Sequence, residues 1–203
     1  MSIDRFNALA REWDAKPQRV EGAMVFVDKI KNSLPNDISH CSLLDYGCGS
    51  GLVSFGFAND VKEILGLDNS IGMVEVYNEK AKQIGFKNIN AKLHDIDKES
   101  LDENCFDIIA TNMTMHHITD TYEFINKLST SLKENGKLFI ADLYSEDGTF
   151  HSDNTGVVHF GFEKESIIDA FKKAGLKNIH LETLQTISKP HCDFDVFFVV
   201  GEK

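Results

Sequence analysis

The stretch Leu43-Leu44-Asp45-Tyr46-Gly47-Cys48-Gly49-Ser50-Gly51 decides how this chain folds. It reads as a buried strand that runs directly into a glycine-rich turn and then into a helix. Glycine lets the backbone bend tightly and approach a ligand closely. A turn of this kind, at the carboxyl end of the first strand of a doubly wound sheet, is where nucleotide-like cofactors bind. The motif therefore predicts both a fold class and a cofactor site.

The spacing of the glycines argues against a dinucleotide or a phosphate as the ligand. A dinucleotide fingerprint requires a third glycine at position 52, where the chain has Leu52, and a phosphate-binding loop requires a Lys followed by Ser or Thr, which is absent. Asp45 beside the turn would repel a pyrophosphate but would attract a ligand end that carries an ammonium and a sulfonium. The charge of Asp45 therefore favours S-adenosylmethionine over NAD(P).

Two more acidic residues follow the next two strands. Asp68 ends Leu65-Gly66-Leu67-Asp68, nineteen residues after Gly49, where ribose hydroxyls would be met. Asp95, in His94-Asp95-Ile96, follows the third strand at the same edge of the predicted sheet, within reach of an adenine amino group. Three strand ends therefore point at one ligand.

Apolar runs and helical patterns alternate along most of the chain. Strands are predicted at residues 42–46, 63–68, 88–93, 106–111 and 137–142, and two more at 177–184 and 195–201. The alternation predicts a parallel sheet that helices cover on both faces. The roughly ten residues between the last two strands are too few for a crossover helix, so this pair should be antiparallel. We expect a doubly wound α/β fold, a Rossmann-like sheet of seven mostly parallel strands with an antiparallel last strand.

Caps and helix breakers mark the predicted helix ends. The pairs of first and closing residues are Pro17 and Pro35, Ser70 and Gly85, and Thr119 or Asp120 and Gly136, with Gly175 closing the last helix. The third of these helices includes Leu132. The helix from Pro17 and the one before it form an N-terminal extension, residues 1–40, while residues 41–203 form the core of a single domain. Phe6 and Trp13 either fill the core of the extension or form a lid over the acceptor pocket.

Composition narrows the partners and the location. The chain has 203 residues, of which 42% are hydrophobic, enough for one compact domain. Its 21 Lys and Arg against 32 Asp and Glu give a net charge of -11, which disfavours nucleic acid and anionic lipid as partners. No apolar stretch reaches the roughly 18 residues of a membrane span, and the first residues lack the apolar segment of a signal peptide. We therefore expect a cytoplasmic protein that does not bind membranes.

The cysteines and histidines do not predict a metal site. The four cysteines form neither a C-x-x-C pair nor a zinc-ligand spacing, so reduced thiols are expected. His116, His117, His151 and His159 fall in loops that should converge above the carboxyl edge of the sheet, but their spacing matches no compact zinc motif. We expect no metal.

Seven segments, in this order, resemble class I S-adenosylmethionine-dependent methyltransferases, in particular small-molecule enzymes similar to quinone-biosynthesis methyltransferases. They are LLDYGCGSG, LGLDNS, HDI, FDIIATNMTMHHI, GKLFIADLY, VHFGFEKESIIDAFKKAGLKN and FFVVGEK, and they cover nearly the whole chain. The resemblance implies an enzyme that uses S-adenosylmethionine to methylate a small-molecule acceptor.

The resemblance also assigns residues to the cofactor site. They are Asp45, Gly47, Gly49, Gly51, Asp68, Met73, Asp95, Ile96, Asn112 and Met113. The glycines would shape the methionine pocket, which Asp45 helps to orient, and Asp68 would hold the ribose. Met73 would pack beside the adenine, and Asp95 would bond its amino group with Ile96 as an apolar neighbour. The last two residues would line the pocket after the fourth strand. Tyr46 departs from the small or apolar residue often found beside the turn.

Methyl transfer from a sulfonium is an in-line displacement, to which a protein contributes mainly positioning and the exclusion of water. If the acceptor is a hydroxyl or a protonated nitrogen, a base must take a proton, and His117, His151 and His159 are the candidates. A carbon, thiol or already deprotonated acceptor requires none. Two alternatives stay open: an NAD(P)-dependent oxidoreductase, which shares the parallel sheet, and a regulatory protein that binds S-adenosylmethionine without transferring its methyl group. The sequence predicts neither the acceptor nor the oligomeric state.

Overall fold

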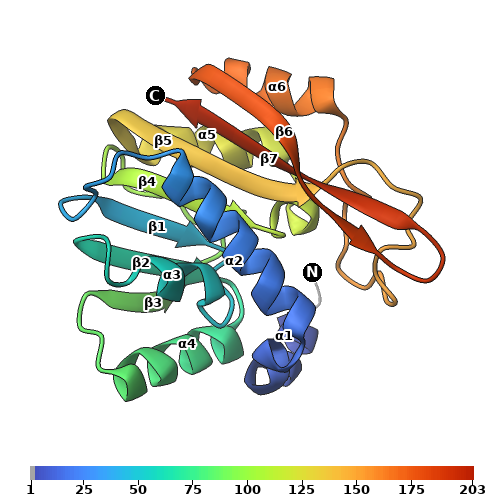
Figure 1. Cartoon of the computed structure of the whole chain (residues 1–203), viewed down its shortest axis with the longest axis horizontal. Helices are drawn as coiled ribbons and strands as arrows, with labels where there is room; N and C mark the ends of the chain where they lie inside the picture. Colours follow the sequence, from blue (N-terminus) through green and yellow to red (C-terminus); the bar gives the residue numbers. More distant parts are fainter. Residues whose placement is uncertain (1–2) are drawn as a thin grey trace.

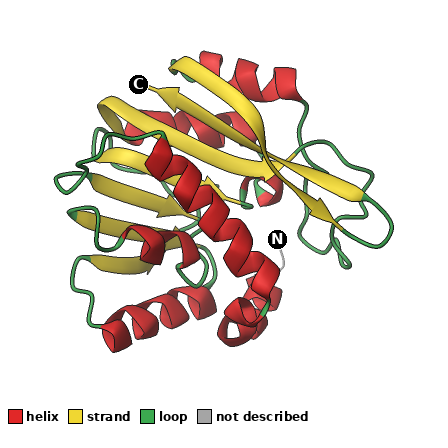
Figure 2. Cartoon of the chain, in the orientation of Figure 1, coloured by secondary structure: helices red, strands yellow, loops and turns green. Residues whose placement is uncertain are grey.

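Within residues 3–203, the part of the chain that the computed structural model describes, seven strands form one sheet in the order β3-β2-β1-β4-β5-β7-β6 (Figure 1; Figure 2). The strands are β1 Ser42–Tyr46, β2 Glu63–Asp68, β3 Ile89–Leu93, β4 Phe106–Asn112, β5 Leu132–Leu143, β6 Lys177–Ser188 and β7 Asp193–Glu202. The first five strands pair in parallel, and β7 is antiparallel to both β5 and β6. The predicted α/β fold with an antiparallel last strand is confirmed.

Helices cover both faces of the sheet. α2 (Pro17–Asn32), α3 (Leu52–Phe57) and α4 (Ile71–Ile84) pack on one face, and α5 (Thr121–Ser131) and α6 (Lys164–Lys173) pack on the other. Each face has its own apolar core, with Phe26, Phe57 and Tyr77 in the first and Phe124 and Phe171 in the second. β1 lies between the two cores with all five of its residues buried, as a strand covered on both sides should be.

Most predicted helix ends are confirmed. Pro17 is the first residue of α2, and the Ser70 side chain caps α4 by accepting a hydrogen bond from the Met73 N–H. Gly85, in the left-handed conformation, closes α4 as predicted. Of the two residues proposed as the cap of α5, the structure selects Asp120.

The end of α5 differs from the prediction. The helix ends at Ser131, and Leu132 pairs with Phe106 of β4 as the first residue of β5. Gly136 does not close the helix but lies inside β5, where an added Cβ would come within 2.8 Å of the Lys133 carbonyl oxygen. Close backbone packing therefore explains this glycine, and the predicted role as a helix cap is wrong.

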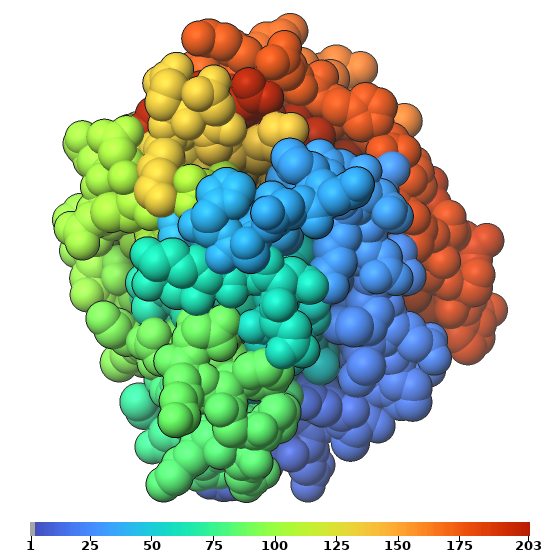
Figure 3. Space-filling view, turned by 60° about the vertical axis from the view of Figure 1, so that its left-hand side comes forward, coloured from blue at the N-terminus to red at the C-terminus, as the bar shows by residue number. Residues whose placement is uncertain are grey.

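The segment before α2 lies against the carboxyl ends of the strands. It consists of α1 (Ile3–Leu9) and the 3-10 helix η1 (Ala10–Ala15), both of which contact α4. Figure 3 shows the blue N-terminal region between the green α4–β3 region and the orange and red C-terminal strands. Within the described residues, α1 buries no side chain and η1 buries only Ala10. The described helices include none long and apolar enough to cross a membrane.

Candidate active site

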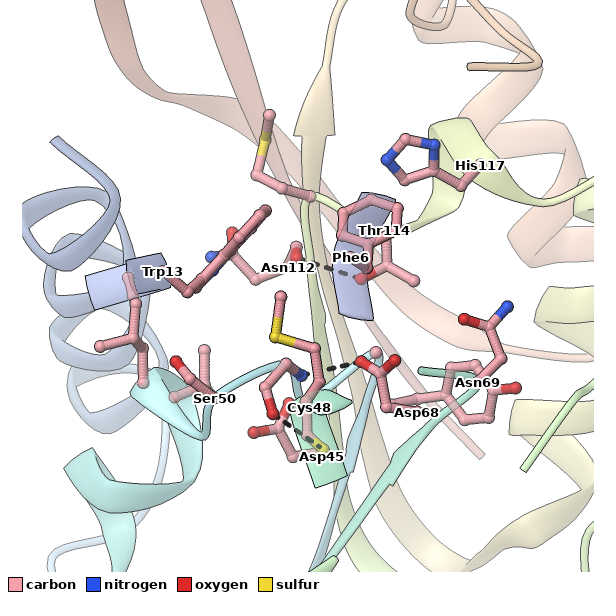
Figure 4. A pocket seen from close by; sticks show the side chains of 18 of the residues that line it. Phe6, Trp13, Asp45, Cys48, Ser50, Asp68, Asn69, Asn112, Thr114 and His117 are labelled. Atoms are coloured by element: carbon pink, nitrogen blue, oxygen red, sulfur yellow. Dashed lines mark hydrogen bonds between the residues drawn. The ribbon is translucent and has the colours of Figure 1, made fainter. Parts of the chain in front are cut away.

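A pocket opens at the carboxyl ends of β1 and β4, where the order of the strands reverses (Figure 4). This reversal is where open α/β sheets bind their ligands. The predicted site residues that line the pocket are Asp45, Gly47, Gly49, Asp68, Met73, Asp95, Ile96, Asn112, Met113 and His117. Gly51 lies just outside the lining, as the N-cap of α3. His151 and His159 lie in the loop between β5 and α6 and are not part of the lining. The His151 ring is 6.2 Å from the ring of the lining residue His117, and the His159 side chain bonds to the lining residue Ile118.

Backbone N–H groups of the glycine turn are already bonded within the protein. The Gly47 and Cys48 N–H groups donate to the Leu67 carbonyl oxygen, at 2.7 and 3.1 Å. The Gly49 N–H donates to Asp68 Oδ2 at 2.9 Å. A phosphate-binding turn needs such groups free to point at the ligand. The turn is therefore poorly suited to a pyrophosphate.

Gly47 shows why the turn requires glycine. Its φ is +71°, and an added Cβ would lie 2.2 Å from Thr114 Oγ1. Thr114 follows β4, and its hydroxyl donates to the Asn112 carbonyl oxygen at 3.1 Å. The bare backbone of Gly47 thus allows the end of β4 to pack over the end of β1, which closes this side of the pocket.

Asp45 is a buried carboxylate in the pocket wall. Asp45 is only 1% exposed. Its Oδ2 accepts hydrogen bonds from the Ser54 N–H at 3.0 Å and from the Ser54 hydroxyl at 2.6 Å. Burial raises the pKa of Asp45 from 3.8 to about 6, against the lowering effect of these bonds. A nearby positive charge would lower that pKa again, so the site favours a cationic ligand group.

Asp68 holds the turn with one oxygen and the start of α4 with the other. Oδ2 accepts from Gly49, and Oδ1 accepts from the Ser70 N–H at 2.9 Å. Burial raises the pKa of Asp68 in spite of these bonds. A carboxylate oxygen has room for a second donor, so the group remains able to accept from ligand hydroxyls.

Tyr46, the residue that departs from the family pattern, organises the loop after β3. Its ring packs against His94 and Phe124, with centroid separations of 5.8 and 5.4 Å. Its hydroxyl accepts from the Ile96 N–H at 3.0 Å and lies 3.3 Å from His94 Nδ1. Tyr46 therefore fixes Ile96 in the pocket wall.

Asp95 stands next to Ile96, where its side chain is 25% exposed. Its Oδ2 accepts from Lys98 Nζ at 2.7 Å, and its Oδ1 accepts from the Asp97 N–H at 3.2 Å. The bond from Lys98 lowers the pKa of Asp95. A ligand amino group at this position would share the carboxylate with Lys98.

Aromatic residues and one arginine from the N-terminal segment complete the pocket. Phe6 and Trp13 line it with their rings 5.6 Å apart, which favours the lid over the alternative of an internal core (Figure 4). Arg19 stacks over the Trp13 ring at 3.5 Å and donates to the Trp13 carbonyl oxygen at 3.1 Å. Among the described lining residues, Arg19 is the only Lys or Arg. Arg19 could not be predicted as a pocket residue from the sequence, because no local motif marks an arginine in the first turn of α2.

Polar contacts hold the N-terminal segment over the pocket. Asn7 Oδ1 accepts from the Ser70 hydroxyl at 2.7 Å. Asp14 pairs with Lys80 Nζ at 2.5 Å and accepts from the hydroxyl of Ser50, within the glycine turn. The segment is therefore tied to the two elements that shape the cofactor side of the pocket, the glycine turn and α4.

The three predicted histidines have different surroundings. His117 lines the pocket, with its Nδ1 at 2.8 Å from the Gly156 carbonyl oxygen, so that nitrogen carries the proton. Burial lowers the pKa of His117 to about 4, and burial lowers the pKa of His151 to about 4 as well. Both rings are neutral at pH 7. His159 Nε2 lies 2.9 Å from the Ile118 carbonyl oxygen and donates to it.

A fourth histidine, His116, forms a buried pair with Asp142 at the end of β5. His116 Nδ1 lies 2.7 Å from Asp142 Oδ1, and the two side chains are 1% and 0% exposed. The His116 N–H donates to Asp142 Oδ2 at 3.2 Å, and the Leu143 N–H donates to Oδ1 at 2.8 Å. Burial alone would raise the pKa of Asp142, but His116 and these bonds lower it, so the carboxylate stays charged.

Known proteins that resemble this chain in sequence are methyltransferases. A family model described as a methyltransferase domain matches residues 37–175. An uncharacterized methyltransferase of Schizosaccharomyces pombe, C1347.09, is 39% identical over 155 residues, which are 69% of this chain and 55% of that protein. A ubiquinone biosynthesis O-methyltransferase of Pelagibacter ubique is 31% identical over 156 residues, which are 70% of this chain and 63% of that protein.

The crystal structure of an S-adenosylmethionine-dependent methyltransferase from Aquifex aeolicus shares the fold. It superposes with a TM-score of 0.71 at 18% identity and covers 97% of both chains. The chain spans about half the length of the curated relatives it matches.

Proposed function

Because the chain belongs to the class I S-adenosylmethionine-dependent methyltransferase family, whose cofactor is S-adenosylmethionine, we propose that it transfers the methyl group of this cofactor to a small-molecule acceptor. The main support for the proposal is that Asp45, Asp68 and Asp95 line one pocket. In the glycine turn beside them, the N–H groups of Gly47, Cys48 and Gly49 are bonded within the protein. Acids of this kind suit a cationic, hydroxyl-bearing cofactor and repel a pyrophosphate.

The methionine end of the cofactor finds both charges that it requires. Asp45 would face the ammonium, and Arg19 would face the carboxylate, since a guanidinium binds carboxylates through several N–H groups. Gly47, Gly49 and Gly51 would shape the space between them.

The nucleoside end would lie along β2 and the loop after β3. Asp68 would accept hydrogen bonds from the ribose hydroxyls. Met73 and Ile96 would pack on the adenine ring and Asp95 would accept from its amino group, while Asn112 and Met113 would border the transferable methyl.

When bound, the cofactor supplies an activated methyl group on a sulfonium. The chain contributes position and a dry site. Phe6 and Trp13 would cover the pocket, so the N-terminal extension, residues 1–40, would act as a lid on the core, residues 41–203. For an acceptor that arrives with its proton, the bases would be His117, His151 or His159, because the loops that carry them adjoin the pocket.

The net charge of -11 supports an acceptor that is neither nucleic acid nor an anionic membrane lipid. We also propose a cytoplasmic location, where the four free thiols would stay reduced.

Calorimetry and a product search test the proposal. S-adenosylmethionine and S-adenosylhomocysteine should bind at micromolar levels or tighter, about -8 kcal/mol or better, and NAD should not. Preferential NAD binding would reassign the chain to the oxidoreductases. Incubation with S-adenosylmethionine and a metabolite extract should give methylated products in a mass-spectrometric search. Cofactor binding without any such product, in extracts from several growth conditions, would support the regulatory alternative.

A further inference from the structure

Two ring nitrogens beside the pocket are buried without a hydrogen-bond partner among residues 3–203. They are His116 Nε2 and His151 Nδ1. The two rings are neighbours, with centroids 5.0 Å apart and an interplanar angle of 42°. Buried polar atoms are ordinarily hydrogen-bonded. A single proton, shared after a ring rotation or through one water molecule, would satisfy both nitrogens, because one would donate and the other accept.

The far side of the His116 ring is fixed by Asp142. The carboxylate can only accept, so His116 Nδ1, at 2.7 Å, carries a proton and Nε2 has the lone pair while the ring is neutral. A carboxylate partner stabilises a histidine that takes a second proton. Among residues 3–203, neither His117 nor His151 has a carboxylate hydrogen-bonded to its ring. Within this cluster, His116 is therefore the ring best able to hold a positive charge.

The other histidines differ in their ability to pass a proton onward. His117 has its Nδ1–H bonded to the Gly156 carbonyl oxygen, so a proton accepted at Nε2 has no route through the ring. His159 has its Nε2–H bonded to the Ile118 carbonyl oxygen. The His117 ring lies closer to His116, with centroids 4.1 Å apart, than the His151 ring, at 5.0 Å. Of these two rings, however, His151 is the one whose Nδ1 is buried without a partner among residues 3–203, so it can accept at Nε2 and release from Nδ1.

We propose that the Asp142–His116 pair holds the proton that leaves the methyl acceptor, that His151 delivers this proton, and that the acceptor is therefore a compound with a reacting O–H or N–H group. The inference rests on the proposed methyl transfer. His151 would reach the acceptor from the loop beside the pocket lining, while His116 and Asp142 would act through it as positioning residues. A carboxylate or thiolate acceptor would need no such pair, because it arrives without a proton to lose.

In the proposed step, the oxygen of an O–H acceptor gains the methyl group and loses its proton. An oxygen lone pair forms the bond to the methyl carbon, and the electron pair of the C–S bond leaves on sulfur, which becomes a neutral thioether. The O–H electron pair stays on oxygen as the proton moves to His151 Nε2. The Nδ1 proton of His151 moves to His116 Nε2. The positive charge thus passes from the sulfonium to the His116 ring beside Asp142.

Charged groups around the histidines also favour the transfer of the positive charge to His116. Lys189 donates to the Phe150 carbonyl oxygen and disfavours a second proton on His151. Arg5 acts in the same direction on His117. Glu146 faces Lys189, and Asp142 is the carboxylate in contact with a ring of the cluster. A proton that enters the cluster is therefore drawn toward His116.

Nitrogen NMR of the full chain, labelled with ¹⁵N-histidine, tests the pair without an acceptor. At pH 8, His116 should carry a proton on Nδ1 and the lone pair on Nε2, and the Nδ1 proton should resonate downfield of the other ring N–H protons, because its acceptor is a carboxylate. Asp142→Asn should move this proton signal upfield, whereas His180→Gln, at an exposed site on β6, should leave it unchanged. A His116 with its proton on Nε2, or an Nδ1 proton signal that Asp142→Asn does not move, would overturn the proposal.

Kinetics with an acceptor from the product search give a second test. At pH 7, Asp142→Asn should lower kcat by about 10²- to 10⁴-fold, with S-adenosylhomocysteine affinity within about twofold of wild type. Raising the pH should restore turnover as the acceptor ionises in solution; an equal loss at every pH would mean a merely structural role and would overturn the proposal. If Asp142→Asn does not fold, His151→Asn should show the same pH-dependent loss while the His116 Nδ1 proton signal persists. Failure of the wild type to bind S-adenosylhomocysteine would instead contradict the proposed function, and the NMR spectrum of the ligand-free protein would still test the Asp142–His116 pair.

Discussion

Asp45 carries its charge where water cannot solvate it, and its pKa of about 6 against an ordinary 3.8 measures the cost. For a carboxyl whose pKa is raised by folding, the stabilising contribution is complete below pH 3.8 and is lost as the pH rises through 6. Above pH 6 the ionised group therefore opposes folding. The protein keeps it at a position where a cationic ligand would relieve the penalty.

The first prediction is that Asp45→Asn stabilises the ligand-free protein at pH 8 while it weakens S-adenosylmethionine binding. The pKa difference corresponds to up to about 3 kcal/mol, because one pKa unit is about 1.4 kcal/mol. Thermal unfolding at pH 8 and pH 4 measures the difference in the free energy of unfolding between the variant and the wild type. The variant should be more stable at pH 8 and no more stable at pH 4. Asp142→Asn is the matched control and should destabilise at pH 8, since the pKa of Asp142 is lowered rather than raised. Equal stability of wild type and Asp45→Asn at pH 8 would contradict the burial argument.

A second prediction concerns Asp68, which accepts from Gly49 and is proposed to accept from the ribose. Asp68→Ala should reduce S-adenosylhomocysteine affinity by roughly 1.5 to 3 kcal/mol, the worth of hydrogen bonds to a charged group. Calorimetry at pH 7.5 checks this, with Asp169→Ala, an exposed acid on α6, as the control that should bind normally. Unchanged affinity in a folded Asp68→Ala protein would place the ribose elsewhere.

Single residues also show what a sequence can predict about a site. Asp45, Asp68 and Asp95 could be placed together because parallel strands share one carboxyl edge. Arg19 could not, since its position depends on how α2 returns over the end of β1. The pairing of His116 with Asp142 depends likewise on the lateral neighbours β4 and β5, and their spacing of 26 residues carries no local signal.

At the scale of elements, local patterns predicted strands well and helix ends less well. The core strands β1 and β2 have the predicted bounds, because each has apolar residues at its centre and a turn signal directly after it. α5 ends five residues before its predicted closing glycine, since the pairing of Leu132 with Phe106 is a tertiary contact that overrides the helical period. The N-terminal segment was predicted as helical, but its contacts with Ser50 and Ser70 were not.

The third prediction concerns these contacts. Asp14→Ala removes both the Lys80 ion pair and the Ser50 bond, so backbone amides of residues 3–15 should exchange hydrogen faster. Cofactor affinity should fall by only about twofold to fivefold, because partly exposed pairs contribute roughly 0.2 to 1 kcal/mol. Arg11→Ala is the control: it removes an exposed pair with Glu79 that touches no pocket residue, and it should leave cofactor affinity unchanged. If the hydrogen-exchange rates of Asp14→Ala equal those of the wild type, the apolar contacts of Phe6 and Trp13 are sufficient to hold residues 3–15 over the pocket.

For the molecule as a whole, a bound ligand should measurably increase the free energy of unfolding. Binding to the folded state alone stabilises it by about 2.7 kcal/mol at a ligand concentration one hundred times Kd. In a chain of 203 residues this should raise Tm by roughly 5 to 11 °C, at about 2 to 4 °C per kcal/mol. Scanning fluorimetry with S-adenosylhomocysteine tests this fourth prediction, with NAD as the compound expected to give no change. A shift with NAD alone would contradict the cofactor assignment at the level of the whole fold.

The side-chain hydrogen bonds that hold residues 3–15 over the pocket have a consequence for the rate of turnover. A cover that buries only Ala10 and is held by a few side-chain bonds can detach without disturbing either core. The spent cofactor, however, would leave past Phe6 and Trp13, so its departure would wait on that detachment. We therefore expect product release, rather than bond making, to limit steady-state turnover, and we expect a burst of methylated product in the first cycle that grows smaller when Asp14 is replaced by Ala.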